Sequence, residues 1–218
     1  MDKTSKIASI ILVVIILVIV VWYGVGKKSV PEVEKPIRIG AILALTGDLG
    51  FVGEGMRNAL EMAKDNALIE YGKKVEFVIQ DDKSCSPTEN ITIMNQFANV
   101  YKLRSVIGST CSHSMLAITP VADNNKVLLI SPSATIPEIR DEGEYIFRTC
   151  PADDLRAKVL AEYIYDKIGK RVALLYENAD APIAFNEMFK EIYENLGGEI
   201  VAEEINERGA TDLRTQIS

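Results

Sequence analysis

From residue 36 onward, short apolar runs of strand length alternate with segments whose apolar residues recur at helical spacing. The apolar runs, which we predict to be strands, are 36–45, 74–79, 106–108, 127–130, 145–147, 171–176 and 199–205. The clearest helical stripes are Met56, Leu60, Ala63 and Ala67, and later Phe185, Met188, Phe189, Ile192 and Leu196. Strand and helix patterns that alternate in this way predict an α/β fold with mainly parallel sheets.

The pattern restarts after the segment 148–151, which predicts two doubly wound lobes. We assign the first lobe to residues 36–149 and the second to residues 150–218. Gly209 to Asp212 opens a last helix, and the chain reaches Ser218 without a helix stop signal. We therefore expect the second lobe to be incomplete.

The segment 7–25 is apolar apart from Ser9 and has lysines on both flanks. A helix of about 19 residues can cross a hydrocarbon core roughly 30 Å thick. A cleaved secretory signal has a shorter apolar run and a small-residue cleavage site, of which Gly24-Val25-Gly26 is a poor version. We predict a retained transmembrane anchor, after a short flank (1–6) and before a linker (26–35), with a cleaved signal as the alternative.

The charge of the chain limits its partners. It carries 24 Lys and Arg against 31 Asp and Glu, a formal net charge of −7. An acidic chain is repelled by phosphate backbones and by anionic lipid headgroups. We therefore expect no nucleic-acid partner, and we expect membrane contact only through the segment 7–25.

Two of the predicted strands run directly into small hydroxyl residues. The strand 127–130 leads into Ser131-Pro132-Ser133-Ala134-Thr135, and the strand 106–108 leads into Ser109-Thr110-Cys111-Ser112. In open α/β sheets, ligands bind in a crevice outside the carboxyl ends of the strands, so both loops are expected to open on one crevice. The alternative is that Ser-Pro-Ser is ordinary turn chemistry.

Ser112 and Thr135 have the chemistry to bind a carboxylate. Ser112 stands where a helix should begin, and free backbone N–H groups at a helix start favour an anion. A hydroxyl and an N–H group from each loop could hold a carboxylate without an arginine. A free amino acid also presents an ammonium, for which the Ser133 carbonyl is a candidate acceptor. The alternative for Ser112 is a plain N-cap serine.

Catalytic and nucleotide-binding patterns are weak. His113 is the single histidine, and adjacent residues of a helix diverge by about 100°, so Ser112 and His113 would not easily form a nucleophile–base pair. No Gly-x-Ser-x-Gly elbow or metal-ligand pattern is present, and the glycine-rich segment 46–55 fits neither nucleotide-binding fingerprint. We predict a protein that is not an enzyme, with no cofactor and no metal. Asp81-Asp82 is interpreted as a solvated strand end.

The three cysteines are Cys85, Cys111 and Cys150. If the globular part lies outside the cytosol, a disulfide becomes possible. Cys85 and Cys111 both follow strands in neighbouring units, which makes them the plausible pair, and Cys150 would remain a packed thiol. Three buried thiols in a reducing compartment are the alternative.

Taken in order, several segments resemble the branched-chain amino-acid-binding proteins, the type 1 periplasmic solute receptors of ABC importers. The similar segments are 39–47, 53–59, 81–85, 106–112, 130–135, 147–149, 197–198 and 209–212. Together they cover nearly everything from residue 36 to the end. No single motif is decisive, but their order and spacing are specific.

The resemblance implies a two-lobed clamp that closes on an amino acid or a related small amide. It implies a Cys85–Cys111 disulfide, an α-carboxylate held at Ser112 and Thr135, and an ammonium at the Ser133 carbonyl. Ala134 lies within the same loop. Val52 falls where the family often has an aromatic residue, a role for which the adjacent Phe51 could substitute. Ala181-Pro182 stands in place of a common Tyr-Gly, so leucine in particular is not implied.

The function expected from this resemblance is that of a substrate-binding protein that delivers its ligand to ABC permease subunits. Its binding domain would lie on the extracytoplasmic side of the cell membrane. The alternatives are a ligand-sensing receptor ectodomain of the same fold and, from a different class, an anchored serine hydrolase that uses Ser112 and His113. We expect this chain to be an amino-terminal portion that binds ligand weakly or not at all, because much of one wall would be missing.

Overall fold

The computed structural model describes residues 13–20, 35–207 and 209–217, and the chain forms two compact units, 1–35 and 36–218. In the first unit, residues 13–20 are helical with exposed side chains. The other residues of the predicted anchor, the flank 1–6 and all of the linker except Lys35 lie outside the described residues. Within the described ranges, no helix has the length and apolarity of a membrane span.

The larger sheet of the second unit has five parallel strands in the order β2-β1-β3-β4-β5. The strands are β1 (Ile37–Leu43), β2 (Val75–Asp81), β3 (Ser105–Ile107), β4 (Leu128–Ser131) and β5 (Ile146–Arg148). The chain adds β2 on one side of β1 and then continues with β3 on its other side. This change of direction is the topological switch point of a doubly wound sheet. The predicted α/β class with parallel strands is confirmed.

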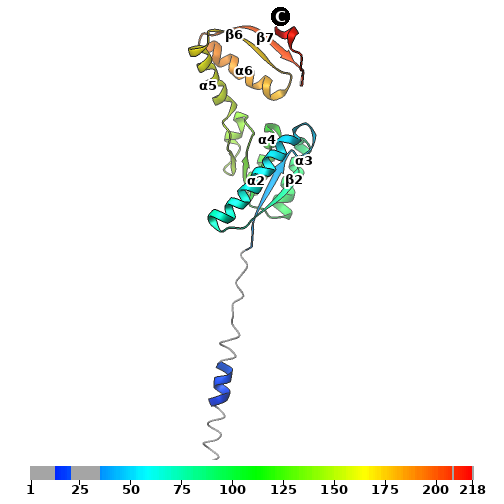
Figure 1. Ribbon diagram of the computed structural model, residues 1–218, viewed down its shortest axis with the longest axis vertical. Helices are drawn as coiled ribbons and strands as arrows, with labels where there is room; N and C mark the ends of the chain where they lie inside the picture. Colours follow the sequence, from blue (N-terminus) through cyan, green and yellow to red (C-terminus); the bar gives the residue numbers. More distant parts are fainter. Residues whose placement is uncertain (1–12, 21–34, 208, 218) are drawn as a thin grey trace, which may run out of the picture. The chain divides into compact units, whose positions relative to one another are not determined.

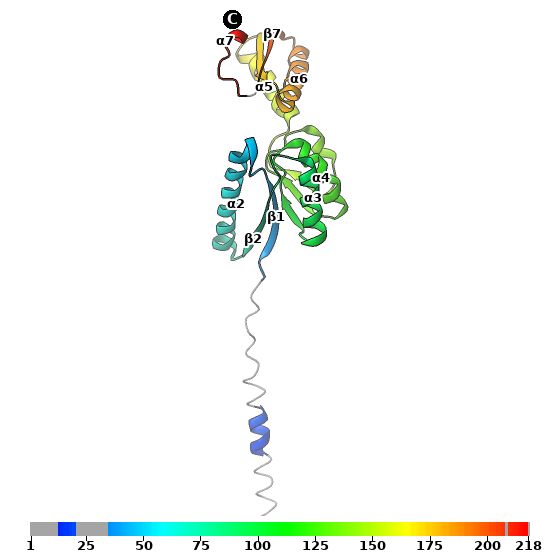
Figure 2. The same ribbon diagram turned by 90° about the vertical axis from the view of Figure 1, so that its right-hand side faces the viewer.

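Helices cover both faces of this sheet (Figures 1 and 2). Helix α2 (Gly50–Tyr71) lies on one face, and α3 (Pro87–Asn95) and α4 (Ser112–Asn124) lie on the other. Successive residues of β1 therefore serve two cores, as the two-residue period of a strand requires. Ala41 and Leu43 pack with Leu60 of α2, whereas Ile42 belongs to the larger core on the other face. The 3-10 helices η1 (Gly47–Leu49) and η3 (Pro137–Asp141) lie in the connections, and the π-helical segment η2 (Gln96–Val100) continues α3.

The glycine-rich segment 46–55 is helical over much of its length. Helix α2 begins at Gly50, so Gly53 and Gly55 lie inside its first two turns. Gly53 is buried, and a Cβ atom there would lie 2.0 Å from the Ala44 carbonyl oxygen at the end of β1. Glycine is used here because it permits helix and strand to approach closely.

The smaller sheet pairs β6 (Arg171–Glu177) with β7 (Glu199–Asn206) in parallel. Helices α5 (Asp153–Lys167) and α6 (Asp180–Asn195) enclose a separate core, in which the rings of Phe189 and Tyr193 stack with centroids 5.2 Å apart. The last helix, α7 (Arg214–Ile217), starts later than the predicted opening at Gly209 to Asp212. The Asp212 carboxylate accepts the Arg214 N–H at 3.2 Å, which places Asp212 before the helix.

Candidate ligand-binding site

The loops that follow β3 and β4 lie side by side. The two strands pair in parallel, with Ile107 opposite Ile130, so their carboxyl ends meet at one edge of the sheet. Two serine side chains of the second loop donate to backbone carbonyls of the first: Ser131 Oγ to Ser109 O at 2.8 Å, and Ser133 Oγ to Thr110 O at 2.6 Å. Ser-Pro-Ser therefore does more than turn the chain, because its hydroxyls fasten one loop to the other.

Ser112 makes the third link between these loops. Its hydroxyl oxygen accepts the backbone N–H of Thr135 at 3.2 Å and that of Ile136 at 3.4 Å. Cys111 holds the N-cap position of α4 and Ser112 is the first helical residue. The plain N-cap interpretation of Ser112 is therefore wrong, because its hydroxyl bonds the neighbouring loop. The structure thus brings together Ser112 and Thr135, the two residues expected to share a carboxylate.

Thr135 is held at each of its polar atoms. Its carbonyl oxygen accepts from the Asp153 N–H at 2.9 Å and from the Arg148 guanidinium at 3.2 Å. Its hydroxyl donates to Asp153 Oδ2 at 2.7 Å. Asp153 begins α5 and is buried, so the loop is tied to the first turn of that helix. No motif or periodicity in the sequence predicts this contact between Thr135 and Asp153.

Two further expected groups lie within the same loop. Ala134 is fully buried, and its carbonyl accepts from the Cys150 thiol at 3.3 Å. Within the described part of the chain, no hydrogen bond is donated to the Ser133 carbonyl oxygen.

Phe51 is 77% exposed in the first turn of α2, and Val52 beside it is half-buried.

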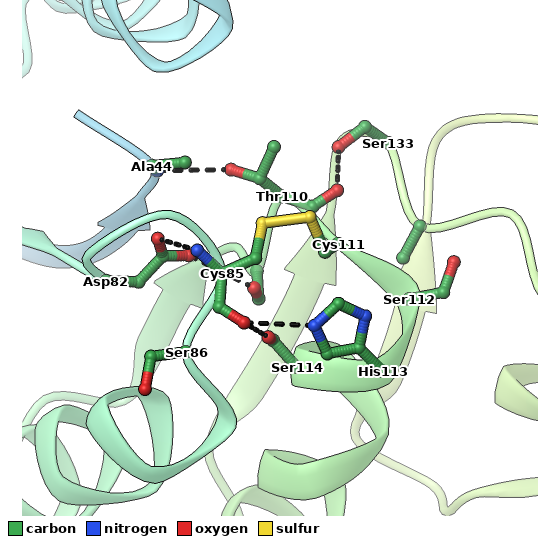
Figure 3. Close-up of a disulfide and its surroundings, with 12 residues drawn as sticks. Ala44, Asp82, Cys85, Ser86, Thr110, Cys111, Ser112, His113, Ser114 and Ser133 are labelled. Carbon is green, nitrogen blue, oxygen red and sulfur yellow. Dashed lines mark hydrogen bonds between the residues drawn. A yellow bond between two sulfur atoms is a disulfide. The ribbon is translucent and has the colours of Figure 1, made fainter. Parts of the chain in front are cut away.

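The structure contains the Cys85–Cys111 disulfide, with the Cα atoms 5.8 Å apart (Figure 3). Cys111 immediately precedes Ser112, so the bond fixes the start of α4. The Cys85 end is a tight turn in which Lys83, Ser84 and Cys85 all have left-handed backbone angles, with φ of 54°, 62° and 66°. Non-glycine residues rarely adopt this conformation, so the turn needs strong local support.

Asp82 supplies that support and corrects the prediction of a solvated strand end. Its side chain is buried, accepts the Cys85 N–H at 2.7 Å and lies 3.5 Å from the Ser109 hydroxyl. Asp82 thus connects the disulfide turn to the β3 loop, and a paired aspartate in the sequence gave no sign of this burial.

Asp81 anchors the start of the glycine-rich segment. It accepts the Leu45 N–H at 3.0 Å, the Thr46 hydroxyl at 2.7 Å and the Lys83 N–H at 3.0 Å. Partial burial raises its pKa, but the hydrogen bonds, led by that from Thr46, outweigh this effect, and the pKa lies below its ordinary value.

The hydrolase alternative lacks its nucleophile–base pair. Figure 3 shows the His113 ring directed at the Cys85 carbonyl oxygen, which lies 3.0 Å from Nε2, and the Ser114 hydroxyl donates to the same oxygen at 2.5 Å. The Ser112 hydroxyl bonds Thr135 and Ile136 instead. His113 thus belongs to the support of the disulfide turn. Among the described residues, no group of three His, Cys, Asp or Glu could hold a metal ion.

Comparisons with known proteins agree with this architecture. Residues 36–218 match the family described as "Periplasmic binding protein". The chain is 29% identical to the leucine-, isoleucine-, valine-, threonine- and alanine-binding protein of Pseudomonas aeruginosa, over 88% of this chain and 52% of that protein. It is also 29% identical to the Leu/Ile/Val-binding protein BraC3 of Rhizobium johnstonii, over 81% of this chain and 48% of that protein.

Solved structures give the same result. The branched-chain amino acid transporter substrate binding protein LivJ of Streptococcus pneumoniae, in complex with isoleucine, matches with a TM-score of 0.72 and 28% identity, over 84% of this chain and 53% of that one. The leucine binding protein LivK of Thermotoga maritima matches with a TM-score of 0.70 and 26% identity, over 83% of this chain and 52% of that one. The chain spans about half the length of these relatives, which are solute-binding proteins and not enzymes. The chain belongs to the periplasmic binding protein family.

Proposed function

We propose that this protein is the substrate-binding component of an ABC importer and that its ligand is an aliphatic amino acid or a related small amide. The observation that carries the proposal is the hydrogen bond between Ser112 and Thr135, which joins the ends of two adjacent parallel strands. The relatives named for binding leucine, isoleucine and valine support the choice of ligand class.

The ligand carboxylate would bind where Ser112 now meets the second loop. A carboxylate oxygen is a stronger acceptor than a hydroxyl, so it would compete with Ser112 Oγ for the Thr135 N–H. It would also accept the Ser112 hydroxyl proton. The Ser133 carbonyl would accept from the ligand ammonium, and Phe51, Val52 and Ala134 would contact the rest of the ligand.

The remaining parts of the proposal concern location and delivery. A disulfide persists in oxidising compartments, so the Cys85–Cys111 bond supports an extracytoplasmic binding domain. The apolar segment 7–25 would serve as its single-pass membrane anchor. We assign residues 36–149 and 150–218 to two lobes that close on the ligand, with the segment 148–154 as one hinge strand. The closed form would dock on permease subunits.

Calorimetric titration of the full-length protein with the twenty amino acids and with small aliphatic amides tests the proposal. We expect saturable binding of at least one aliphatic amino acid or amide. Absence of heat with every compound, confirmed by an unchanged melting temperature at millimolar ligand, would overturn the proposal.

A further inference from the structure

The amino-terminal edge of the five-stranded sheet is basic, although the whole chain has a formal net charge of −7. Exposed Lys and Arg side chains stand at or just before the starts of four neighbouring strands, β2, β1, β3 and β4. They are Lys74 before β2, Lys35 and Arg38 at β1, Lys102 and Arg104 before β3, and Lys126 before β4. The expectation that membrane contact is confined to the segment 7–25 rests on net charge and does not account for this clustering.

Strand pairing brings these cations together. The four strands are parallel, and Ile37 pairs with Val75, so the strands begin at one edge of the sheet (Figure 2). The residues before the strands continue the same ladder. The Ile37 N–H donates to the Lys74 carbonyl at 2.8 Å, and the Leu128 N–H donates to the Arg104 carbonyl at 3.0 Å. Because neighbouring strands lie about 4.8 Å apart, the strand starts that carry these cations span about 15 Å of the edge.

Most of these cations are not neutralised inside the protein. Arg38 is paired with Glu76 at 3.4 Å. Among the residues that the structure describes, no carboxylate forms an ion pair with Lys35, Lys74, Lys102, Arg104 or Lys126. These side chains can therefore meet an external anion.

The acidic side chains near this edge define its limits. Glu70 is exposed at the end of α2, and Asp123 accepts the Tyr145 N–H at 3.3 Å. A group of acidic residues precedes β5, namely Asp141, Glu142 and Glu144. The basic surface is therefore confined to the starts of β2, β1, β3 and β4, and we call this surface the basic edge.

The chain enters the sheet at the basic edge. The segment 7–25 is the proposed membrane anchor, and the linker 26–35 joins it to Pro36, directly before β1. Ten residues span at most about 35 Å when fully extended. Such a tether would keep the basic edge close to the lipid headgroups. The opposite edge of the sheet, which leads to Ser112 and Thr135, lies about 23 Å further on, since β1 has seven residues.

We infer that the basic edge is an electrostatic docking surface for anionic lipid headgroups. The inference rests on the proposed function, because it uses the anchor and the tether assigned there. A Lys or Arg near an anionic membrane surface strengthens binding by about fivefold. In the docked state the carboxyl-terminal edge of the sheet would be directed away from the membrane. The loops of Ser112 and Thr135 would therefore stay accessible to a ligand in solution.

Lysine acylation in lipid nanodiscs tests the docking. The full-length protein is inserted into discs of phosphatidylcholine, or of phosphatidylcholine mixed with phosphatidylglycerol. The reaction of each lysine with a water-soluble N-hydroxysuccinimide ester is then followed by mass spectrometry. We expect Lys74, Lys102 and Lys126 to react about fivefold more slowly on the anionic discs. Lys158 and Lys167, which are exposed on α5, are internal controls and should react equally on both.

Salt shows whether this protection is electrostatic. At about 0.1 M salt the Debye length is about 10 Å, and at about 1 M salt it is about 3 Å. Protection on the anionic discs should therefore disappear at the higher salt concentration. Equal acylation on both kinds of disc at low salt, or protection that high salt leaves unchanged, would overturn the inference.

Charge removal shows whether the basic edge is responsible. In the variant Lys74→Gln/Lys126→Gln, protection of Lys102 on anionic discs should fall below about twofold. Lys158→Gln/Lys167→Gln removes the same charge from α5 and should keep the full protection of Lys102. An equal effect of the two variants would overturn the inference, because it would show that only the net charge matters.

The proposed anchor is tested separately by flotation of the full-length protein with vesicles of phosphatidylcholine alone, which have no net charge. If the protein does not float, co-sedimentation with anionic and neutral vesicles replaces acylation. Preference for anionic vesicles that is lost in Lys74→Gln/Lys126→Gln supports the basic edge, and absence of a preference overturns it. Failure to bind any amino acid would remove the proposed ligand and leave this inference standing.

Discussion

The Thr135 backbone N–H donates to the Ser112 hydroxyl oxygen at 3.2 Å, across 23 residues of sequence. This bond joins the start of α4 to the loop after β4, which are the two elements proposed to hold the ligand backbone. Replacement of Ser112 by alanine should weaken amino-acid binding by about tenfold to hundredfold, since it removes one hydrogen bond to a charged carboxylate.

Calorimetry on the full-length protein measures the effect of Ser112→Ala. Thr92→Ala is a suitable control, because the Thr92 hydroxyl is exposed on α3 and donates only within its own helix. Unchanged affinity in a folded Ser112→Ala variant would show that the Ser112 hydroxyl does not bind the ligand carboxylate.

Reduction of the Cys85–Cys111 bond should destabilise the protein. The bond closes a separation of 26 residues, and loop-closure entropy gives about 3.5 kcal/mol for such a loop, with typical measured values of about 2–4 kcal/mol. Urea unfolding of Cys85→Ser/Cys111→Ser against wild type measures the difference. Cys150→Ser, which removes a thiol that forms no disulfide, is the comparison variant and should lower the free energy of unfolding by less. Equal unfolding midpoints for wild type and the double variant would contradict this role.

Asp82→Ala should be among the more damaging single substitutions around the five-stranded sheet. It leaves the Cys85 N–H and the Ser109 hydroxyl without their carboxylate inside the core. Buried donors without acceptors cost about 1–3 kcal/mol each. The free energy of unfolding should therefore fall by about 2–4 kcal/mol, while Asp65→Ala on the exposed side of α2 should change it by less than about 0.5 kcal/mol. A similar small effect for both substitutions would show that Asp82 does not support the turn.

Stability should fall in acid partly because of Asp81. Its pKa is lower in the folded protein than in the unfolded chain, so its contribution is fully present above the unfolded value of about 3.9. That contribution is lost as the pH falls below this value and through the folded pKa, because the protonated side chain gives up hydrogen-bond acceptors. Urea unfolding at pH 7 and at about pH 3 should show a smaller acid-induced loss for Asp81→Asn than for wild type. An identical loss in both proteins would exclude Asp81 as a contributor.

Much of the fold follows from local sequence patterns. The apolar run 127–130 predicts β4 because a strand buried on both faces needs continuous apolar residues. The meeting of the loops at Ser112 and Thr135 follows from parallel pairing, since the carboxyl ends of neighbouring strands share one edge. Both inferences use rules that act over a few residues or over one strand pair.

The details of the site could not be predicted in the same way. The Thr135–Asp153 bond joins residues on either side of β5, and no periodicity encodes which hydroxyl a helix-start aspartate will meet. Asp82 has the sequence context of a solvated residue, yet it is buried, and the left-handed turn at 83–85 that follows it is not encoded by a local pattern. Ser112 has the residue type and position of an N-cap serine in the sequence. The direction of its hydroxyl could not be predicted, because it depends on a loop 23 residues away.

A crystal structure of the full-length protein with its bound amino acid tests the central claim most directly. The account predicts a ligand carboxylate oxygen at about 2.6–3.2 Å from both Ser112 Oγ and the Thr135 backbone nitrogen, with the ammonium at a similar distance from the Ser133 carbonyl oxygen. A ligand bound elsewhere, or one whose carboxylate contacts neither Ser112 nor Thr135, would contradict it.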